Sequence, residues 1–188
     1  MKVNSTVATL FWVIDMSLLE VGLLDLNDQS RLLQYEQAMY RAFASTPIET
    51  DGVWTVDHAA RRIATKIPYR NQIIIAADWH GELVSAVSVN MDMQNELQLE
   101  GLGFHIVREP GLAVEALSMF ANKTIIGREI LMARVARECG AILKEKGVKV
   151  LWATCEKKHY RAYVAVGFLK YEEVMFHGRE LCLIRYAL

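Results

Sequence analysis

Two tyrosines, Tyr160 and Tyr163, stand three residues apart in the stretch HYRAYVAVGF, residues 159–168. On a helix this spacing places both phenols on one face. A phenol with a pKa near its usual value of about 10 can protonate a thiolate leaving group within hydrogen-bond reach. Alternatively, the two rings pack a helix on a sheet and keep their hydroxyls at the rim. Taken alone, the pair favours packing.

A carboxylate, Glu115, interrupts the apolar run LAVEALSMFA at residues 112–121. Burying an unpaired carboxylate is costly, and a carboxylate in a cleft with a perturbed pKa is a candidate general base. Strand alternation that directs Glu115 to solvent, or to a neighbouring Lys or Arg, accounts for the residue equally well. Both interpretations stay open.

The residues Asn122–Arg128 join this run to a long helical pattern and have the features of an anion site. A helix that begins directly after a strand presents unpaired N–H groups and the positive end of its dipole. Lys123 and Arg128 add positive charge, and Gly127 permits close approach of a ligand. An ordinary helix start with a convenient glycine is the alternative.

The whole chain alternates between strand-like and helix-like patterns, without repeats or linkers, which indicates a single domain over residues 1–188. Strands are predicted at 5–14, 72–78, 83–92, 112–121, 148–155, 168–176 and 180–188. Helices are predicted at 26–44, 55–67, 122–147 and in 159–168. The strand–helix–strand order of the second half predicts parallel pairing there, and the hairpins predict antiparallel neighbours. The fold class is therefore mixed α/β (α+β).

Composition excludes several classes of protein. The net charge of −1 gives no general attraction to nucleic acid, and 53% hydrophobic residues indicate a folded chain. Cys139, Cys155 and Cys182 are odd in number and widely spaced, which argues against disulfides and a cysteine metal site and fits a reducing compartment. The scattered histidines predict no structural metal. The N-terminal apolar run is too short to span a membrane and lacks a cleavage pattern, so we expect a cytoplasmic protein without membrane contact.

Three motifs together resemble the GCN5-related N-acetyltransferase superfamily, the acyl-CoA N-acyltransferases. DWHGELVSAVSV is similar to the family's second and third strands, and ALSMFANKTIIGREIL to its fourth strand and pyrophosphate loop. YVAVGF is similar to the Tyr-x-x-x-Gly-Phe element, with Tyr163, Gly167 and Phe168 in register. The resemblance covers nearly the whole chain. It implies one three-layer domain with a mixed sheet of about seven strands, helices on both faces, and a splay between the fourth and fifth strands.

The resemblance also implies a reaction. A primary amine of a small molecule or peptide attacks the thioester of acetyl-CoA or another acyl-CoA, and no metal takes part. Glu115 would accept the amine proton, a main-chain N–H near Leu117 to Met119 would polarise the thioester carbonyl, and Tyr163 would protonate the thiolate. Holding the two reactants together would supply most of the rate. The implied CoA-binding residues are Leu117, Ser118, Met119, Asn122, Lys123, Thr124, Ile125, Ile126, Gly127, Arg128, Glu156 and Tyr160.

The pyrophosphate loop departs from the family pattern. Its three usual positions fall on Asn122, Ile125 and Gly127, and of the expected residues only the last glycine is kept. The position that is often Asn near the start of the fourth helix is Glu156 or Cys155. Main-chain N–H groups do most of the pyrophosphate binding in this family, so Ile125 need not abolish it. A catalytically inactive acyl-CoA-binding sensor therefore stays open as an alternative.

The long irregular segment 93–111 leaves a second alternative open. Long-chain N-acyl amino acid synthases and acyl-homoserine-lactone synthases share this fold and take acyl chains from a carrier protein. The apolar residues of the segment either line an acyl tunnel or simply cover the sheet edge, and the second reading is preferred. These residues are Leu97, Leu99, Leu102, Phe104 and Ile106.

Two further expectations concern partners. The acceptor amine is expected to contact the first helices and the last hairpin, and the residues suggested there are Met39, Tyr40, Trp54 and His177. The apolar terminal strand ELCLIRYAL would permit pairing in a homodimer.

Overall fold

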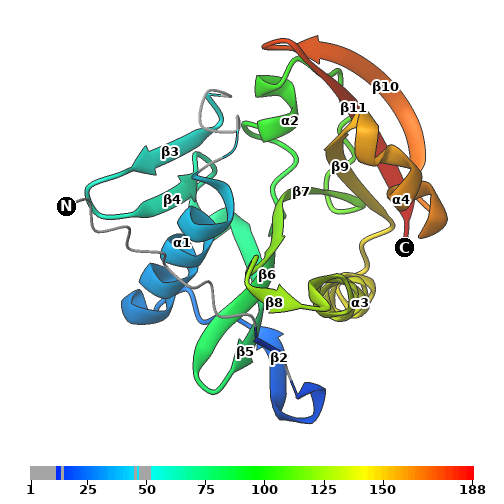
Figure 1. Ribbon diagram of the computed structural model, residues 1–188. Helices are drawn as coiled ribbons and strands as arrows, with labels where there is room; N and C mark the ends of the chain where they lie inside the picture. Colours follow the sequence, from blue (N-terminus) through cyan, green and yellow to red (C-terminus); the bar gives the residue numbers. More distant parts are fainter. Residues whose placement is uncertain (1–11, 14, 45, 47–51) are drawn as a thin grey trace.

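A computed structural model describes residues 12–13, 15–44, 46 and 52–188 of the chain. Its centre is a seven-stranded mixed sheet in the order β10-β11-β9-β7-β6-β5-β2 (Figure 1). In that order the strands are Leu169–Phe176, Arg179–Ala187, Val150–Glu156, Ala113–Ala121, Glu82–Asn90, Gln72–Trp79 and Leu19–Leu23. Strands β7 and β9 pair in parallel, and the other neighbours pair antiparallel. The predicted mixed sheet of about seven strands is confirmed.

Helices cover both faces of this sheet, as predicted (Figure 1). Helix α1 (Gln29–Phe43) and the short helix α2 (Gln98–Gly101) pack on one face, where they share a hydrophobic cluster with alternate residues of the sheet. Helix α3 (Arg128–Glu145) and helix α4 (Tyr160–Ala165) pack on the other face. The core therefore has two layers, one on each side of the sheet.

Local sequence accounts for the elements that were predicted correctly. The Asp28 carboxylate accepts the Ser30 N–H at 2.9 Å and so caps α1, which then buries Tyr35 and Met39 one turn apart on its sheet side. The turn between β5 and β6 places His80 and Gly81 at positive φ, the geometry that two-residue hairpins favour.

The helix predicted at residues 55–67 is wrong. Strands β3 (Trp54–Asp57) and β4 (Arg62–Thr65) form a separate antiparallel hairpin there. Val56, Ile63 and Thr65 share the inner face of this hairpin with Trp54, and this period of two along each strand favours strands over a helix. The Asp57 carboxylate accepts the Ala60 N–H at 2.9 Å, so it closes the turn and does not begin a helix.

The strand predicted at residues 5–14 lies mostly outside the described residues. Trp12–Val13 forms β1, which pairs in parallel with β8 (Ile125–Ile126) in a two-stranded sheet of its own. The seventh strand of the central sheet is β2, which has no counterpart among the predicted strands and pairs with β5. The five residues LEVGL of β2 are too short a pattern to identify a strand before its partner is known.

The β3–β4 hairpin is attached to α1 through the buried carboxylate of Glu36. This carboxylate accepts hydrogen bonds from Arg62 Nε at 2.6 Å and from the Tyr69 hydroxyl at 2.7 Å. Burial and the Glu36 carboxylate both raise the pKa of Tyr69, so its hydroxyl remains a donor. Two donors from outside the helix therefore satisfy one carboxylate on α1.

We expect Tyr69→Phe to lower the free energy of unfolding by about 1.5–3 kcal/mol, because Glu36 loses one of these donors while it stays buried. Urea unfolding measures the change. Tyr171→Phe is the control, because Tyr171 is exposed and its hydroxyl has no hydrogen-bond partner among the described residues. Equal losses in the two variants would show that the hydroxyl of Tyr69 is not important to stability.

Candidate functional site

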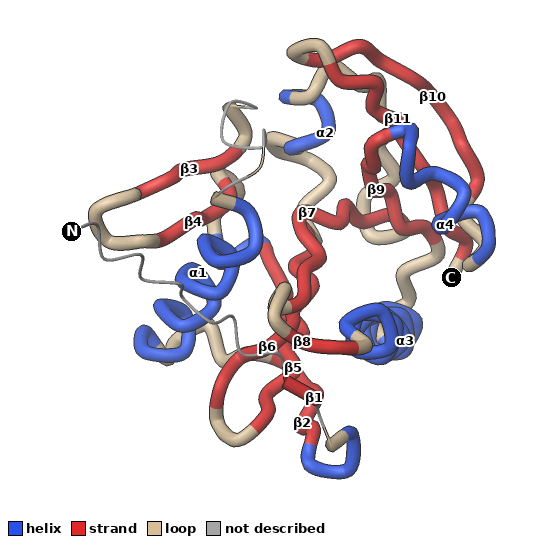
Figure 2. Tube along the Cα trace, in the orientation of Figure 1, coloured by secondary structure: helices blue, strands red, loops and turns tan. Residues whose placement is uncertain are grey.

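The central sheet opens between β7 and β9 (Figure 2). Only Ala113–Glu115 pair with Val150–Trp152, although the strands are nine and seven residues long. Just beyond this point β7 carries a bulge at Leu117, because its neighbours Ala116 and Ser118 pair with consecutive residues of β6. The predicted splay is confirmed, and it leaves the far half of β7 without a partner strand on its β9 side.

Glu115 is the last residue of β7 that pairs with β9, and it is fully buried. Its Oε1 accepts the Leu99 N–H at 2.6 Å, and its Oε2 accepts from Asn90 Nδ2 at 3.1 Å. Burial raises the pKa of Glu115 to about 7, and these hydrogen bonds oppose the shift. The solvent-facing interpretation is therefore wrong, and the carboxyl group can hold or release a proton near neutral pH.

Glu115 belongs to a row of residues that crosses the sheet at one level. Gln72 pairs with Asn90, Asn90 with Glu115, and Glu115 with Trp152. Directly paired residues project to the same face of a sheet, here the face covered by α1 and α2. The row reaches β9 where the split begins.

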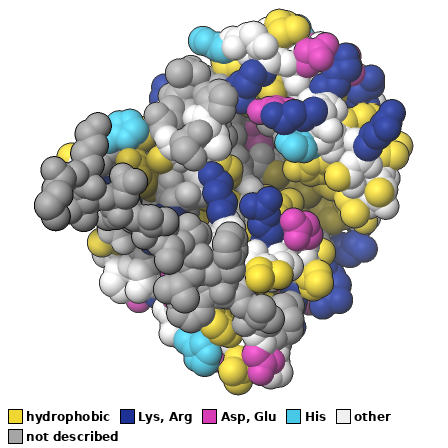
Figure 3. Space-filling view, viewed as in Figure 1, with side chains coloured by type: hydrophobic (Ala, Val, Ile, Leu, Met, Phe, Trp, Pro, Cys, Tyr) yellow, Lys and Arg dark blue, Asp and Glu magenta, His cyan; other side chains and the backbone are white. Residues whose placement is uncertain are grey.

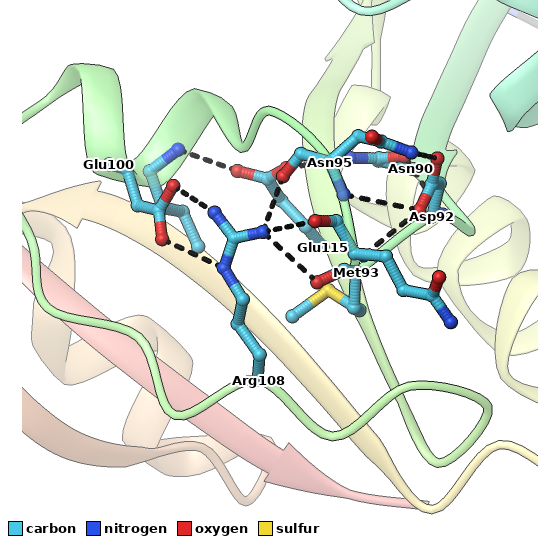
Figure 4. A network of polar contacts seen from close by, with 9 residues as sticks. Asn90, Asp92, Met93, Asn95, Glu100, Arg108 and Glu115 are labelled. Carbon is cyan, nitrogen blue, oxygen red and sulfur yellow. Dashed lines mark hydrogen bonds and ion pairs between the residues drawn. The ribbon is translucent and has the colours of Figure 1, made fainter.

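The segment between β6 and β7 folds over Glu115 and is held there by Arg108 (Figure 4). The guanidinium of Arg108 donates to the main-chain oxygen of Asn95 at 2.7 Å and forms an ion pair with the carboxylate of Glu100 in α2. Because the Leu99 N–H of α2 donates to Glu115, these contacts of Arg108 also fix the shorter of the two hydrogen bonds to the buried carboxylate.

Tyr163, on α4, lies on the opposite face of the sheet. Its ring packs edge-to-face on Phe168 at a centroid distance of 5.6 Å and joins a cluster that includes Ala116 and Cys155. Among the described residues its hydroxyl has no hydrogen-bond partner. Burial, with a smaller effect from Cys155, raises the pKa of Tyr163, so the hydroxyl stays protonated at neutral pH. Contact with the cluster around Ala116 brings Tyr163 to the start of the split.

Tyr160 and Glu156 are engaged in other contacts. The Tyr160 hydroxyl accepts the Lys170 N–H at 3.2 Å, which attaches α4 to β10. Glu156 forms ion pairs with Lys158 and Arg179, and the hydrogen bond from Lys158 holds the pKa of Glu156 below its ordinary value. Their role in CoA binding stays a prediction.

The expected anion loop has more regular structure than predicted. Asn122 Oδ1 accepts from the Thr124 N–H at 3.1 Å and from the Thr124 hydroxyl at 2.9 Å, and Ile125–Ile126 then form β8. Helix α3 begins at Arg128 and not at residue 122. Gly127 precedes it with φ of 78°, a conformation that favours glycine.

Charges of both signs stand at the start of α3. Lys123 and Arg128 are exposed there, as an anion site requires. The Arg128 Nε also lies 3.3 Å from the carboxylate of Glu129, in the first turn of the helix. A phosphate bound at this point would have to displace or share that contact.

In the stretch of β7 implied to bind pantetheine, Leu117 to Met119, two residues form hydrogen bonds with groups on the α1 side of the sheet. The Leu117 carbonyl accepts from Gln98 Nε2 at 2.9 Å. Ser118 Oγ lies 2.7 Å from Ser88 Oγ and 3.2 Å from the Tyr35 hydroxyl. Met119 is half-buried and packs in the layer of α3.

Several groups around Glu115 were not predicted from the sequence. Three buried side-chain atoms of residues in the row of Glu115 or in α2 have no hydrogen-bond partner in the described part of the chain: Gln72 Oε1, Gln98 Oε1 and Trp152 Nε1. Asn90 and Gln72 become recognisable only once the strand register is known. For Trp152, a signal was present in the sequence, because it is a large indole inside the otherwise small and aliphatic strand VKVLWATC.

The apolar residues of segment 93–111 belong to the core. Leu97, Leu99, Leu102 and Phe104 are at most 3% exposed and pack in the α1-side cluster, and Ile106 packs against it. They therefore fill the space over the sheet, as the covering interpretation predicts.

The residues suggested for the acceptor side are scattered. Met39 and Trp54 are buried in the α1-side core, and the Tyr40 hydroxyl lies 3.1 Å from His58 Nδ1. His177 is exposed in the β10–β11 turn. The structure does not bring these four together around Glu115.

Two cavities lie on the α1 side of the molecule. One, of about 220 Å³, lies between α1 and the β5–β6 turn, remote from the split. The other, of about 80 Å³, lies between the β3–β4 hairpin and α2 and has Leu97 and Gln98 in its wall. Of the two, the second reaches the residues around Glu115. Figure 3 also shows a hydrophobic recess near α3 and α4, with Lys and Arg side chains at its rim.

Neither a protein-family model nor a curated protein matches the sequence. Solved structures do match the fold. The acyl-homoserine-lactone synthase LasI matches with a TM-score of 0.73 at 9% identity over 90% of this chain and 88% of that chain. The CoA-dependent acyl-homoserine lactone synthase MesI matches with a TM-score of 0.68 at 9% identity over 89% of this chain and 88% of that chain. An aminoglycoside 6'-N-acetyltransferase solved with coenzyme A matches with a TM-score of 0.61 at 8% identity over 89% of this chain and 96% of that chain.

These likenesses show that the chain has the fold of the GCN5-related N-acetyltransferases, which confirms the fold implied by the sequence resemblance. Within the described residues, none of the helices combines the length and apolar character that crossing a membrane requires.

The raised pKa of Glu115 predicts a specific pH dependence of stability. Between its ordinary value of 4.5 and about 7, the folded protein holds a proton that the unfolded chain releases, so the free energy of unfolding falls as pH rises. A shift of this size corresponds to roughly 3 kcal/mol across that range. Urea unfolding of Glu115→Gln, which cannot titrate at this position, should lack this fall.

The comparison uses the difference between the wild-type and variant curves from pH 4.5 to 8, because other groups titrate equally in both. The free energy of unfolding of Glu115→Gln should also be lower by a constant amount at every pH. Its side-chain NH2 group cannot accept the hydrogen bond that the Glu115 carboxylate accepts from Asn90 Nδ2. The exposed Glu138→Gln is the matched control. Parallel curves for wild type and Glu115→Gln would mean that the pKa of Glu115 is ordinary.

Proposed function

We propose that this chain is an N-acyltransferase that moves an acetyl or other acyl group from acyl-CoA to a primary amine of a small molecule or peptide. One observation carries the proposal: the sheet splits between β7 and β9, with Glu115 on one face of the split and Tyr163 on the other. Glu115 and Tyr163, whose pKa values are both raised, thus lie on opposite faces of the sheet at a gap where two reactants can meet.

The acyl donor belongs on the side of α3 and α4. The unpaired edge of β7, Gly127 at the N-terminus of α3, and Tyr163 on α4 all belong to this side of the sheet. Main-chain N–H groups at a helix start bind phosphate without particular side chains, which suits a loop that keeps only Gly127. The exposed Lys123 and Arg128 add attraction for a pyrophosphate.

The reaction then needs two proton transfers and one bond exchange. The amine nitrogen bonds to the thioester carbon, its proton passes to Glu115, and the C–S bond breaks. Glu115 is closed to solvent, so we assign this transfer to a water molecule between the amine and the carboxylate. A main-chain N–H near Leu117 to Met119 stabilises the oxyanion, and Tyr163 gives its proton to the departing thiolate.

A second candidate is a synthase of the acyl-homoserine-lactone type, which takes a longer acyl chain from CoA or from a carrier protein. The likeness to LasI and MesI favours it, because their TM-scores of 0.73 and 0.68 exceed the 0.61 of the aminoglycoside acetyltransferase. The two candidates share the split and the roles of Glu115 and Tyr163, and they differ in the donor.

Acyl-CoA binding is tested by thermal unfolding with acetyl-CoA, octanoyl-CoA and the matching acyl-pantetheines, which lack the nucleotide and pyrophosphate. A ligand at 100 times its dissociation constant should add about 2.7 kcal/mol. We expect acyl-CoA to stabilise the protein and acyl-pantetheine to stabilise it much less. Equal effects would exclude pyrophosphate binding at Gly127, and stabilisation by an acylated carrier protein alone would favour the synthase.

Tyr163→Phe tests the chemistry. We expect the rate of CoA release in the presence of an amine panel to fall by roughly 10²- to 10⁴-fold, as for loss of a general acid. Acyl-CoA binding should be unchanged, because the hydroxyl has no partner within the described residues. Tyr171→Phe is the matched control, because it also removes one phenol oxygen and keeps the ring that packs edge-to-face on Trp152 at 5.0 Å. Wild-type protein that binds acyl-CoA and turns over no amine would instead be the sensor.

A further inference from the structure

Unsatisfied polar atoms gather at the root of the split. A buried donor or acceptor without a partner is rare in folded proteins and usually marks a bound water or ligand. Gln98 Oε1 and Trp152 Nε1 are both buried without a hydrogen-bond partner in the described part of the chain, and both residues are neighbours of the Glu115 region, Gln98 through Leu117 and Trp152 through strand pairing. One is an acceptor and the other a donor.

Gln98 places its acceptor over the start of the split. Its Nε2 donates to the Leu117 carbonyl at 2.9 Å, two residues beyond Glu115 on β7, so the amide is fixed against the strand. The residue is 5% exposed. A ligand N–H would satisfy the remaining oxygen of this amide.

Trp152 places its donor on the other flank. It is the register partner of Glu115 on β9, is 2% exposed, and lies in the same α1-side cluster as α2. An indole N–H can only donate, so an ammonium group does not satisfy it, whereas a carbonyl or carboxylate oxygen does, and the lone pair of a neutral amine is needed for attack on the thioester.

We propose that Gln98 and Trp152 are the acceptor-binding groups of this enzyme, and that they select an amine with a carbonyl or carboxyl group on the adjacent carbon. The inference rests on the proposed function. The amine N–H bonds Gln98 Oε1, the ligand oxygen accepts from Trp152 Nε1, and the nitrogen is held beside Glu115 at the gap. An alkylamine without the oxygen leaves the indole unsatisfied.

We take the cavity between the β3–β4 hairpin and α2, which reaches Gln98, as the route by which a ligand approaches this site. It has Gln98 in its wall and a volume of about 80 Å³, well above the roughly 10–15 Å³ that one water needs. Lys66 and Glu96 stand at the cavity with opposite charges, so the route has no strong bias against a zwitterion.

Isothermal titration calorimetry on the full chain tests the site without turnover. The ligands are glycinamide, alaninamide, leucinamide and phenylalaninamide, each beside the amine that lacks the carboxamide: methylamine, ethylamine, isoamylamine and phenethylamine. At least one amide should bind wild-type protein about tenfold or more tightly than its paired amine, with and without CoA, as expected for one added hydrogen bond.

Two variants assign the contacts. Trp152→Phe removes only the unpaired N–H, so it should bring the affinity for the amide down to that for the amine and leave the amine unchanged. Gln98→Met should weaken both. Trp79→Phe, which changes an indole at the β5–β6 turn remote from the split, is the control that should alter neither. Because Gln98→Met also frees the Leu117 carbonyl and can unfold the protein, Trp152→Phe carries the decision, with circular dichroism as a check of folding.

Equal binding of amides and amines, no effect of Trp152→Phe, or no binding of any compound overturns the inference. These outcomes are separate from failure of the proposed function. If the protein transfers acyl groups from acyl-CoA to simple alkylamines at a rate that Trp152→Phe does not change, the proposed function holds and the proposed acceptor site is wrong. Selective amide binding without any acyl-CoA binding would keep the site and remove the function.

Discussion

The buried carboxylate of Glu115 is the constraint on which the functional half of the structure depends. A carboxylate in the centre of a sheet is costly unless hydrogen bonds compensate it. Here the compensation comes from β6 through Asn90 and from α2 through the Leu99 N–H. The segment between β6 and β7 must therefore fold back over the sheet, and Arg108 holds it in that position. The residue that suggests chemistry is also the one that positions the cover above it.

In the proposed reaction, the split separates the group that accepts a proton, Glu115, from the group that donates one, Tyr163. Burial raises the pKa of both Glu115 and Tyr163. For the carboxyl group this brings titration close to neutral pH, as a proton acceptor needs, and for the phenol it preserves the proton to be donated. Glu115 projects from β7 to the α1 face, and Tyr163 on α4 packs on the other face, so in the proposed reaction a substrate that bridges the gap meets both groups.

Much of the fold could be predicted because its elements have local patterns. The β5–β6 hairpin follows from alternation around His80 and Gly81, and α1 from a capping residue followed by an apolar stripe. The helix predicted at residues 55–67 was wrong because two four-residue strands resemble one short helix until their pairing is known. Tyr163 was predicted from a motif, whereas the positions of Gln98 and Trp152 follow only from contacts with β7 that are far apart in the sequence.

The departure of the pyrophosphate loop from the family pattern has a structural cause. Ile125 stands where a glycine is usual, and it is buried in the α3-side core while its main chain pairs with Trp12 of β1. A glycine there would leave a gap in that layer and weaken the strand. The stretch before Gly127 therefore serves packing, and the N–H groups available to an anion are confined to Gly127 and the first turn of α3. Since the carboxylate of Glu129 stands in that same turn, it opposes a bare phosphate there, and an acyl donor needs contacts with the unpaired edge of β7 as well as with these N–H groups.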